Sequence, residues 1–194
     1  IDALFEMVSG FATTGASIVP NVEKLSNGMN MWRCFSHWVG GMGIIVFVIA
    51  LSDRVPDQSM YVLRAEMPGP IVGKLVPRAK QTSAILYIIY IAMTVIMFVF
   101  LLCGGEMNLF EAACHSFGTA GTGGFAVLND GCASYSPYIQ TVTTVFMALF
   151  GVNFSVYFFL LCRKFKLAWN NSEVRWYFII IFSAVALITL NLMH

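Results

Sequence analysis

Charge is scarce in this sequence. Only 11% of the 194 residues are Asp, Glu, Lys or Arg, whereas soluble globular domains carry about 25%. Eleven basic residues against ten acidic ones leave a net charge of +1, so the basic stripe that nucleic-acid binding needs is missing. Hydrophobic residues make up 58% of the chain, and the mean hydropathy is +0.77. This composition excludes a disordered chain and predicts an all-α membrane protein that crosses the bilayer several times.

Motifs for catalysis and metal binding are also lacking. The five cysteines form no CxxC pair, which argues against a zinc site and a disulfide framework. No GxSxG occurs, and the neighbours Ser36 and His37, like His115 and Ser116, cannot face each other on a helix. Two intramembrane histidines are too few to favour haem and are better explained by packing. We therefore predict no enzyme, no catalytic residue and no cofactor in this chain.

Four long segments contain no formally charged residue, namely 34–51, 84–103, 138–162 and 176–193. A helix needs about 20 mostly apolar residues to cross the hydrocarbon core of a bilayer. A central Asp, Lys or Arg would cost about 2.5–3.5 kcal/mol on insertion. The four segments are therefore predicted to be membrane spans.

The basic residues are distributed unevenly among the connections. Nine of the eleven lie in the segments 52–81 and 163–175, whereas 104–137 contains none and 1–33 contains two. Because short cytoplasmic loops are enriched in Lys and Arg, we expect the two basic segments to face the cytoplasm. Segments 1–33 and 104–137 should then face outward.

The two outward segments share an unusual pattern. In the second, a short apolar stretch at 109–117 precedes four glycines and two threonines within 118–124. In the first, 2–11 leads into a similar Gly/Thr stretch. The two copies align without gaps, so that Asp2 falls on Glu111, Thr13 on Thr122 and Gly15 on Gly124. This pattern predicts a repeat of about 110 residues, built of span, half-helix, turn and span.

A half-helix that ends within the membrane favours a particular chemistry. Non-helical backbone at that depth is tolerated only when it is buried in protein or lines a water-filled cavity. The C-terminal end of the half-helix carries partial negative charge, which attracts a cation. Glycine permits positive φ in the turn that follows, and backbone carbonyls can replace the hydration shell of the ion. About four such turns are needed to surround an ion, so we expect an internal fragment of a longer protein. The alternative is that 121–124 forms only a tight external turn.

At these residues the chain resembles the TrkH/KtrB superfamily of potassium-uptake proteins, and it is most similar to the TrkH branch. The matching stretches are TTGA at 13–16, WVGGMGI at 38–44, AEMPGP at 65–70, PR at 77–78, TGGF at 122–125 and GVNF at 151–154. The resemblance implies four membrane–pore–membrane repeats, each donating one filter strand around a pseudo-fourfold axis. About one and a half repeats would be present here.

The resemblance also implies how the chain is divided. Residues 1–51 would be the pore helix, filter strand and second span of repeat 2, and 52–81 a cytoplasmic loop. Residues 82–163 would be repeat 3, with a broken second span. Residues 164–173 would be a further cytoplasmic loop, and 174–194 the first span of repeat 4.

Two sets of site residues follow from the resemblance. Backbone carbonyls of a selectivity filter would bind K⁺ at Thr13, Thr14, Gly15, Thr122, Gly123 and Gly124. An intramembrane gating loop would comprise Gly151, Val152, Asn153, Phe154 and Ser155. The residues themselves agree with a break, because glycine weakens a helix and buried polar groups need partners. A glycine tolerated in a packed helix bundle is the alternative.

The resemblance finally implies potassium uptake across the bacterial cytoplasmic (inner) membrane by a multi-pass protein in the lipid bilayer. It implies a homodimer and a cytosolic nucleotide-binding regulatory subunit as partners. The competing hypothesis is a structural or sensory membrane module whose Gly/Thr turns only pack helices. Arg33 is expected at the outer membrane interface, with its charge in water. Five acidic residues could concentrate cations at the outer mouth, and several of them could instead cap helices: Asp2, Glu6, Glu23, Glu106 and Glu111.

Overall fold

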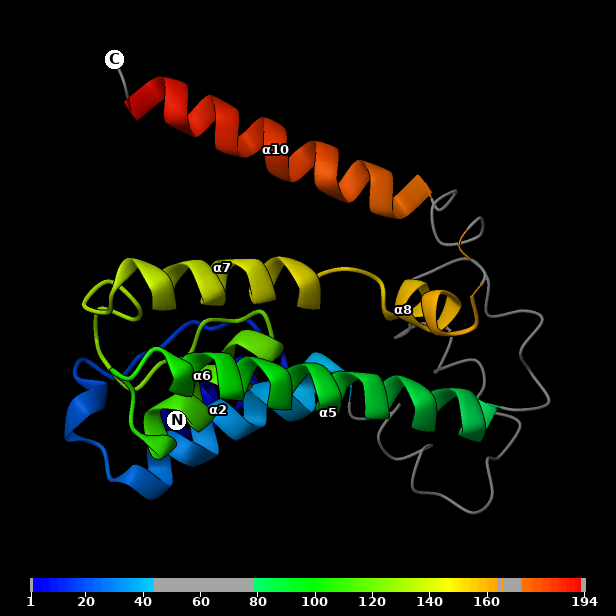
Figure 1. Cartoon of the computed structure of the whole chain (residues 1–194). Coiled ribbons are helices and arrows are strands. Elements are labelled where there is room, and N and C mark those ends of the chain that lie inside the picture. The colour runs from blue at the N-terminus through cyan, green and yellow to red at the C-terminus, as the bar shows by residue number, and fades with distance from the viewer. Residues whose placement is uncertain (1, 44–78, 164, 166–171, 193–194) are drawn as a thin grey trace.

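The fold, taken from a computed structural model, is described for residues 2–43, 79–163, 165 and 172–192. Within these residues the regular elements are helices and no strand occurs, which confirms the all-α prediction (Figure 1). The elements are α1 (Asp2–Phe11), the 3-10 helix η1 (Val22–Lys24), α2 (Asn27–Gly41), α5 (Ala79–Cys103), α6 (Leu109–Ala120), α7 (Pro137–Phe150), α8 (Phe154–Leu161) and α10 (Ser172–Leu192).

Local sequence signals explain where the helices begin. Asn108 precedes α6, and its side-chain oxygen accepts a hydrogen bond from the backbone N–H of Glu111 at 2.9 Å. The Glu111 carboxylate accepts in return from the backbone N–H of Asn108 at 3.1 Å, which completes a capping box. Ser26 caps α2 through its side chain, and α7 begins with Pro137 in its first turn. Of the two roles considered for Glu111, the structure therefore shows helix capping.

Among the described residues, two helices are long and apolar enough to cross a membrane, over Ala84–Cys103 and Ser172–Leu192. The predicted span 138–162 consists of two helices, α7 and α8, bent by 85° at the break between them. The predicted span 34–51 lies partly outside the described residues. Its described part leaves the helix after Gly41, and Gly43 has a φ of +79°. The segments 52–81 and 164–173, predicted to be cytoplasmic loops, lie largely outside the described residues as well.

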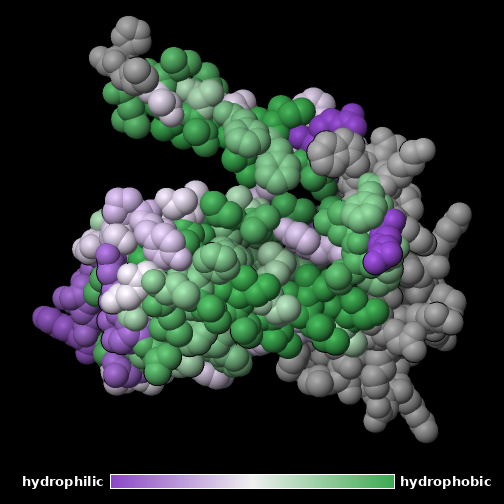
Figure 2. Space-filling model, viewed as in Figure 1, coloured by the Kyte–Doolittle hydropathy of each residue, from purple (hydrophilic) through white to green (hydrophobic). Residues whose placement is uncertain are grey.

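The core forms where α6 packs between α2 and α5. Its buried members are Tyr90, Met97, Leu101, Met107, Ala112, Ala120, Ile139 and Phe150. A separate apolar cluster joins α8 to the first turns of α10, but no residue of α10 is buried. Beyond its first turns, α10 lies apart from the other helices in Figure 1, and Figure 2 shows apolar surface over both α5 and α10. These are surfaces suited to lipid or to further protein.

The repeat found in the sequence is present in the backbone. Helices α1 and α6 end at Phe11 and Ala120, and α2 and α7 end at Gly41 and Phe150, so both pairs keep the register that aligns Gly15 with Gly124. The hydrogen bonds that close α1, from Ala12 N to Val8 O and from Thr13 N to Gly10 O, recur at the equivalent positions after α6. The two predicted outward segments therefore fold as copies of one unit.

Candidate functional site

The two Gly/Thr turns have positive φ at the same two positions. Thr13 and Thr122 have φ values of +53° and +55°, and Gly15 and Gly124 have φ values of +74° and +87°. Positive φ is uncommon for non-glycine residues and is an outlier for β-branched ones. Such strained positions cluster at functional sites. Two threonines in this conformation at equivalent positions therefore mark the turns as a candidate site.

The two turns also touch each other. A Cβ atom at Gly15 would overlap the backbone carbonyl oxygen of Gly123. Segments 13–15 and 122–124, distant from each other in the chain, thus lie side by side. At Gly124, by contrast, an added Cβ would meet nothing within 4 Å. The structure brings together all six residues that were predicted to form a filter.

Helix α2 supports both turns through its glycines. A Cβ at Gly40 would overlap the carbonyl oxygen of Phe11, the last residue of α1. A Cβ at Gly41 would lie 2.9 Å from the Cα of Gly121 and 3.1 Å from the carbonyl oxygen at the end of α6. These neighbours are backbone atoms that cannot rotate away. The GG pair within 38–44 therefore permits close approach of both half-helix ends.

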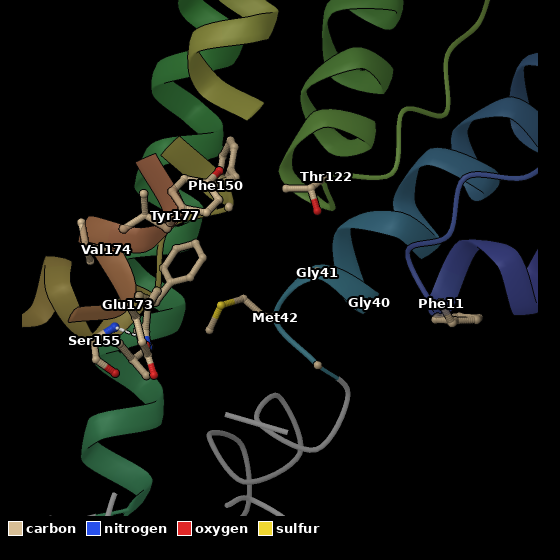
Figure 3. Close-up of a pocket in the computed structure, with 16 residues that line it drawn as sticks. Phe11, Gly40, Gly41, Met42, Thr122, Phe150, Ser155, Glu173, Val174 and Tyr177 are labelled. Atoms are coloured by element: carbon tan, nitrogen blue, oxygen red, sulfur yellow. Dashed lines mark hydrogen bonds between the residues drawn. The ribbon is translucent and has the colours of Figure 1, made fainter. Parts of the chain in front are cut away.

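A cavity of about 620 Å³ lies between the turns and the break in the α7–α8 pair. Phe11 and Thr122 line it from the ends of the half-helices, and residues 40–43 line it from α2. All five predicted gating residues, 151–155, line it too, together with Glu173, Val174 and Tyr177 from α10. Figure 3 shows Phe11 and Thr122 on one side and Phe150, Ser155 and Tyr177 on the other. Because helix C-termini carry partial negative charge, the ends of α1 and α6 make this space favourable for a cation.

Polar groups at the break between α7 and α8 have partners. The Asn153 side-chain oxygen accepts from the backbone N–H of Ser155 at 2.9 Å and so caps α8. Its amide nitrogen donates to the Glu173 carboxylate of α10 at 2.7 Å. A Cβ at Gly151 would collide with the hydroxyl of Tyr177, which donates to the carbonyl of Ala148 at 2.9 Å. The segment 151–155 is thus a break between two helices that hydrogen bonds stabilise, and one of these bonds connects it to α10.

Sequence reasoning missed one feature of the site. Arg33 was expected at the membrane interface, but it is buried, with 2% of its surface exposed. Its Nε lies 2.9 Å from Oε2 of Glu6, so that expectation was wrong because α1 supplies a buried counter-charge. The sequence did contain a signal for this burial: Arg33 is a single basic residue directly before the uncharged segment 34–51. A charge that is buried there requires a partner of opposite charge.

The surroundings of Glu6 favour the ionised form of its carboxylate. Burial alone would raise the pKa of Glu6, but the hydrogen-bond donors around it outweigh burial and hold that pKa below its ordinary value of 4.5. Those donors are the backbone N–H of Ile18 and the side chains of Arg33 and Ser17. The possible role of Glu6 in attracting cations at the outer mouth is therefore wrong, because the carboxylate is buried in an internal ion pair.

The two histidines singled out from the sequence are packed against aromatic rings. The ring of His37 is fully buried and lies 4.1 Å, centroid to centroid, from the ring of Phe125. His115 packs edge-on to Tyr135, and its Nδ1 lies 3.6 Å from the Sγ of Cys132. Within the part of the chain that the structure describes, no group of three or more His, Cys, Asp or Glu could hold a metal ion. Both histidines are thus packed within the protein and not paired as haem ligands.

Comparison with known proteins places this geometry in context. Residues 1–193 match the sequence model of the TrkH family, described as "Cation transport protein". The "Trk system potassium uptake protein TrkH" of Escherichia coli K12 is 37% identical over 195 residues, covering 98% of this chain and 40% of that protein. The "Trk system potassium uptake protein TrkG" of the same organism is 31% identical over 197 residues, covering 100% of this chain and 40% of that protein.

A solved structure is similar as well. The crystal structure of the potassium transporter TrkH from Vibrio parahaemolyticus superposes with a TM-score of 0.65 at 30% identity. The match covers 81% of this chain and 30% of that one. The chain therefore spans well under half the length of the relatives it matches.

Proposed function

Since the chain belongs to the TrkH family of cation transport proteins, we propose that it forms part of a potassium conduction pathway across the bacterial cytoplasmic membrane. The observation that carries this proposal is the direct contact between two turns of matched backbone conformation above a shared cavity. Related proteins are named for potassium uptake, which supports K⁺ as the ion. Passage of an ion needs no covalent step, in keeping with a family of transporters and not of enzymes.

In this proposal the turns form two quadrants of a selectivity filter. The carbonyl oxygens of Thr13, Thr14 and Gly15 would bind K⁺ on one side, and those of Thr122, Gly123 and Gly124 on the adjacent side. Carbonyl oxygens can take the place of the hydration shell of the ion. The left-handed threonines and glycines support this role, because positive φ changes the direction of successive peptide groups within a turn. The other two quadrants would come from sequence outside residues 1–194.

The break at 151–155 is proposed to be a gate. It lines the cavity below the turns, so an ion that leaves the filter would meet it next. A non-helical segment can change conformation without unwinding a whole span, and its tie to Glu173 couples it to α10. Inward movement of K⁺ would be driven by the membrane potential, which is worth about 2.3 kcal/mol per charge per 100 mV.

The relatives' names refer to a Trk system, which supports a protein that works with other subunits. We include in the proposal a homodimer and a cytosolic nucleotide-binding subunit, as the family resemblance implies. The apolar α5 and α10 support a multi-pass location in the lipid bilayer.

The proposal is tested by ion flux through the full-length protein in liposomes, with ⁸⁶Rb⁺ as the tracer for K⁺. Gly124→Asp should abolish selective flux, because it places a side chain and a charge in the filter. Gly105→Asp is the matched control, since Gly105 also has positive φ, +71°, and open space around it. A structural or sensory module would give no flux in the parent protein. Equal loss in both variants would likewise contradict a filter at 122–124.

A further inference from the structure

A buried ion pair lies behind the filter turns. The side chains of Arg33 and Glu6 are 3% and 6% exposed, and their Nε and Oε2 atoms are 2.9 Å apart. A second donor of the guanidinium, Nη1, reaches Oδ1 of Asn30 at 3.2 Å. Burying such a pair costs about as much desolvation energy as the attraction returns. Stability alone therefore does not account for the pair, and its other contacts must be considered.

The pair holds the chain that leaves the first turn. Oε1 of Glu6 accepts from the hydroxyl of Ser17 at 2.8 Å and from the backbone N–H of Ile18 at 2.7 Å. Nη2 of Arg33 donates to the same Ser17 hydroxyl at 3.3 Å. These residues follow the filter glycine Gly15 by two and three positions. The backbone just beyond the first turn is thus fixed to two charged groups.

The same arginine contacts the chain that leaves the second turn. Its guanidinium carbon lies 4.4 Å from the ring centroid of Phe125, a cation–π distance. Phe125 directly follows Gly124, and its carbonyl oxygen accepts a hydrogen bond from the thiol of Cys34, the neighbour of Arg33. One buried side chain therefore connects the outer ends of both turns.

The arrangement occurs in only one of the two copies. In the register that aligns Gly15 with Gly124, His115 replaces Glu6 and Val142 replaces Arg33. His115 lies against Cys132 and Tyr135 instead of a charged partner. The unit folds with its turn intact in this second copy, so the ion pair is not needed to form a turn.

We propose that Glu6 and Arg33 are positioning residues that fix the spacing between the two filter turns and thereby set the preference for K⁺ over Na⁺. The proposal rests on the filter assignment above. Selectivity depends on how carbonyl oxygens are held around the ion, and K⁺ and Na⁺ differ in the separation they need. Weakening the pair should let the turns shift relative to each other, so that the smaller ion is better accommodated.

The test compares K⁺ and Na⁺ flux through the full-length protein in liposomes. Glu6→Gln keeps the shape and one acceptor oxygen but removes the charge. We expect the K⁺/Na⁺ flux ratio to fall about tenfold, or about 1.4 kcal/mol, while total cation flux persists. Asp2→Asn is the matched control, because Asp2 is exposed and lies on the same helix as Glu6. Its flux ratio should equal that of the parent protein.

Two further variants separate positioning from folding. Ser17→Ala removes hydrogen bonds to both charged groups without burying an uncompensated charge, and it should lower the flux ratio in the same direction. The double variant with Glu6→Gln and Arg33→Gln tests whether neutralising both partners gives the same loss. An unchanged ratio in a folded Glu6→Gln or Ser17→Ala protein would overturn the inference while leaving the filter assignment intact. Absence of K⁺ flux in the parent protein would instead overturn the proposed function.

Discussion

Alanine at Gly15 and alanine at Gly124 are the same chemical change at equivalent positions of the two turns, yet the structure predicts different outcomes. Both glycines have positive φ, so a Cβ at either costs about 1–2 kcal/mol of backbone strain. At Gly124 the added methyl meets nothing within 4 Å, and the strain is the whole cost. At Gly15 it would overlap the carbonyl oxygen of Gly123. Overpacking adds about 1–3 kcal/mol, so the total there is about 2–5 kcal/mol.

The difference should appear in both stability and transport. Thermal unfolding of the full-length protein in detergent should show a larger loss for Gly15→Ala than for Gly124→Ala. In liposomes Gly15→Ala should also lower the K⁺/Na⁺ flux ratio more, because the methyl pushes the turns apart. Gly105→Ala is the control: it has a φ of +71° and open surroundings. It should match Gly124→Ala in stability and leave the flux ratio unchanged.

Equal destabilisation by Gly15→Ala and Gly124→Ala would refute this reasoning. It would mean that the turns do not touch in the membrane, and the proposal of a shared ion pathway would lose the observation that carries it. A larger effect at Gly124 would have the same consequence, because it would place the close contact on the wrong turn.

Three further predictions concern the surroundings of the turns. Asn108→Ala should destabilise the protein by about 1 kcal/mol through loss of the α6 cap, measured by thermal unfolding; an unchanged midpoint would contradict the capping box. Gly151→Ala should alter the rate of ion flux because its methyl meets the Tyr177 hydroxyl, and adding Tyr177→Phe should partly restore the parent rate; no restoration would contradict that contact. The lowered pKa of Glu6 predicts that its contribution to stability is present above pH 4.5 and is lost as the pH falls through the folded-state pKa. Acid unfolding curves of Glu6→Gln should therefore lack that part of the pH dependence, and identical curves would argue against an ionised Glu6.

Features that depend on neighbouring residues in the chain were predictable. Helix α6 follows from a short apolar stretch next to the capping residue Asn108, and the break near Gly151 follows from a glycine and an asparagine inside an apolar run. The positive φ values at Gly15 and Gly124 follow from glycine itself. For these elements the information lies within a few residues of the feature, so periodicity and composition suffice.

Features that depend on distant partners were not predictable in the same way. Arg33 looks like an interfacial anchor when only its own helix is considered, and its burial becomes understandable once Glu6 of α1 is beside it. The need for two glycines at 40 and 41 becomes understandable only once the ends of α1 and α6 are beside them. A single sequence contains these partners but does not say which of them meet.

The two copies of the repeat show why features set by neighbouring residues were predictable and features set by distant partners were not. Turn conformation is set by the helix end and the Gly/Thr sequence, both of which recur in the second copy, and the φ values recur with them. Support behind each turn comes from the side chains of the following helix, where Arg33 has Val142 as its counterpart, and there the copies differ. A pore built from such units can keep one backbone geometry around the ion while each quadrant is held by different chemistry. In such a pore, residues that never touch the ion can change ion selectivity. Substitutions at Glu6 and Arg33 therefore test the origin of the K⁺ preference more directly than substitutions in the turns, which would also change the backbone that contacts the ion.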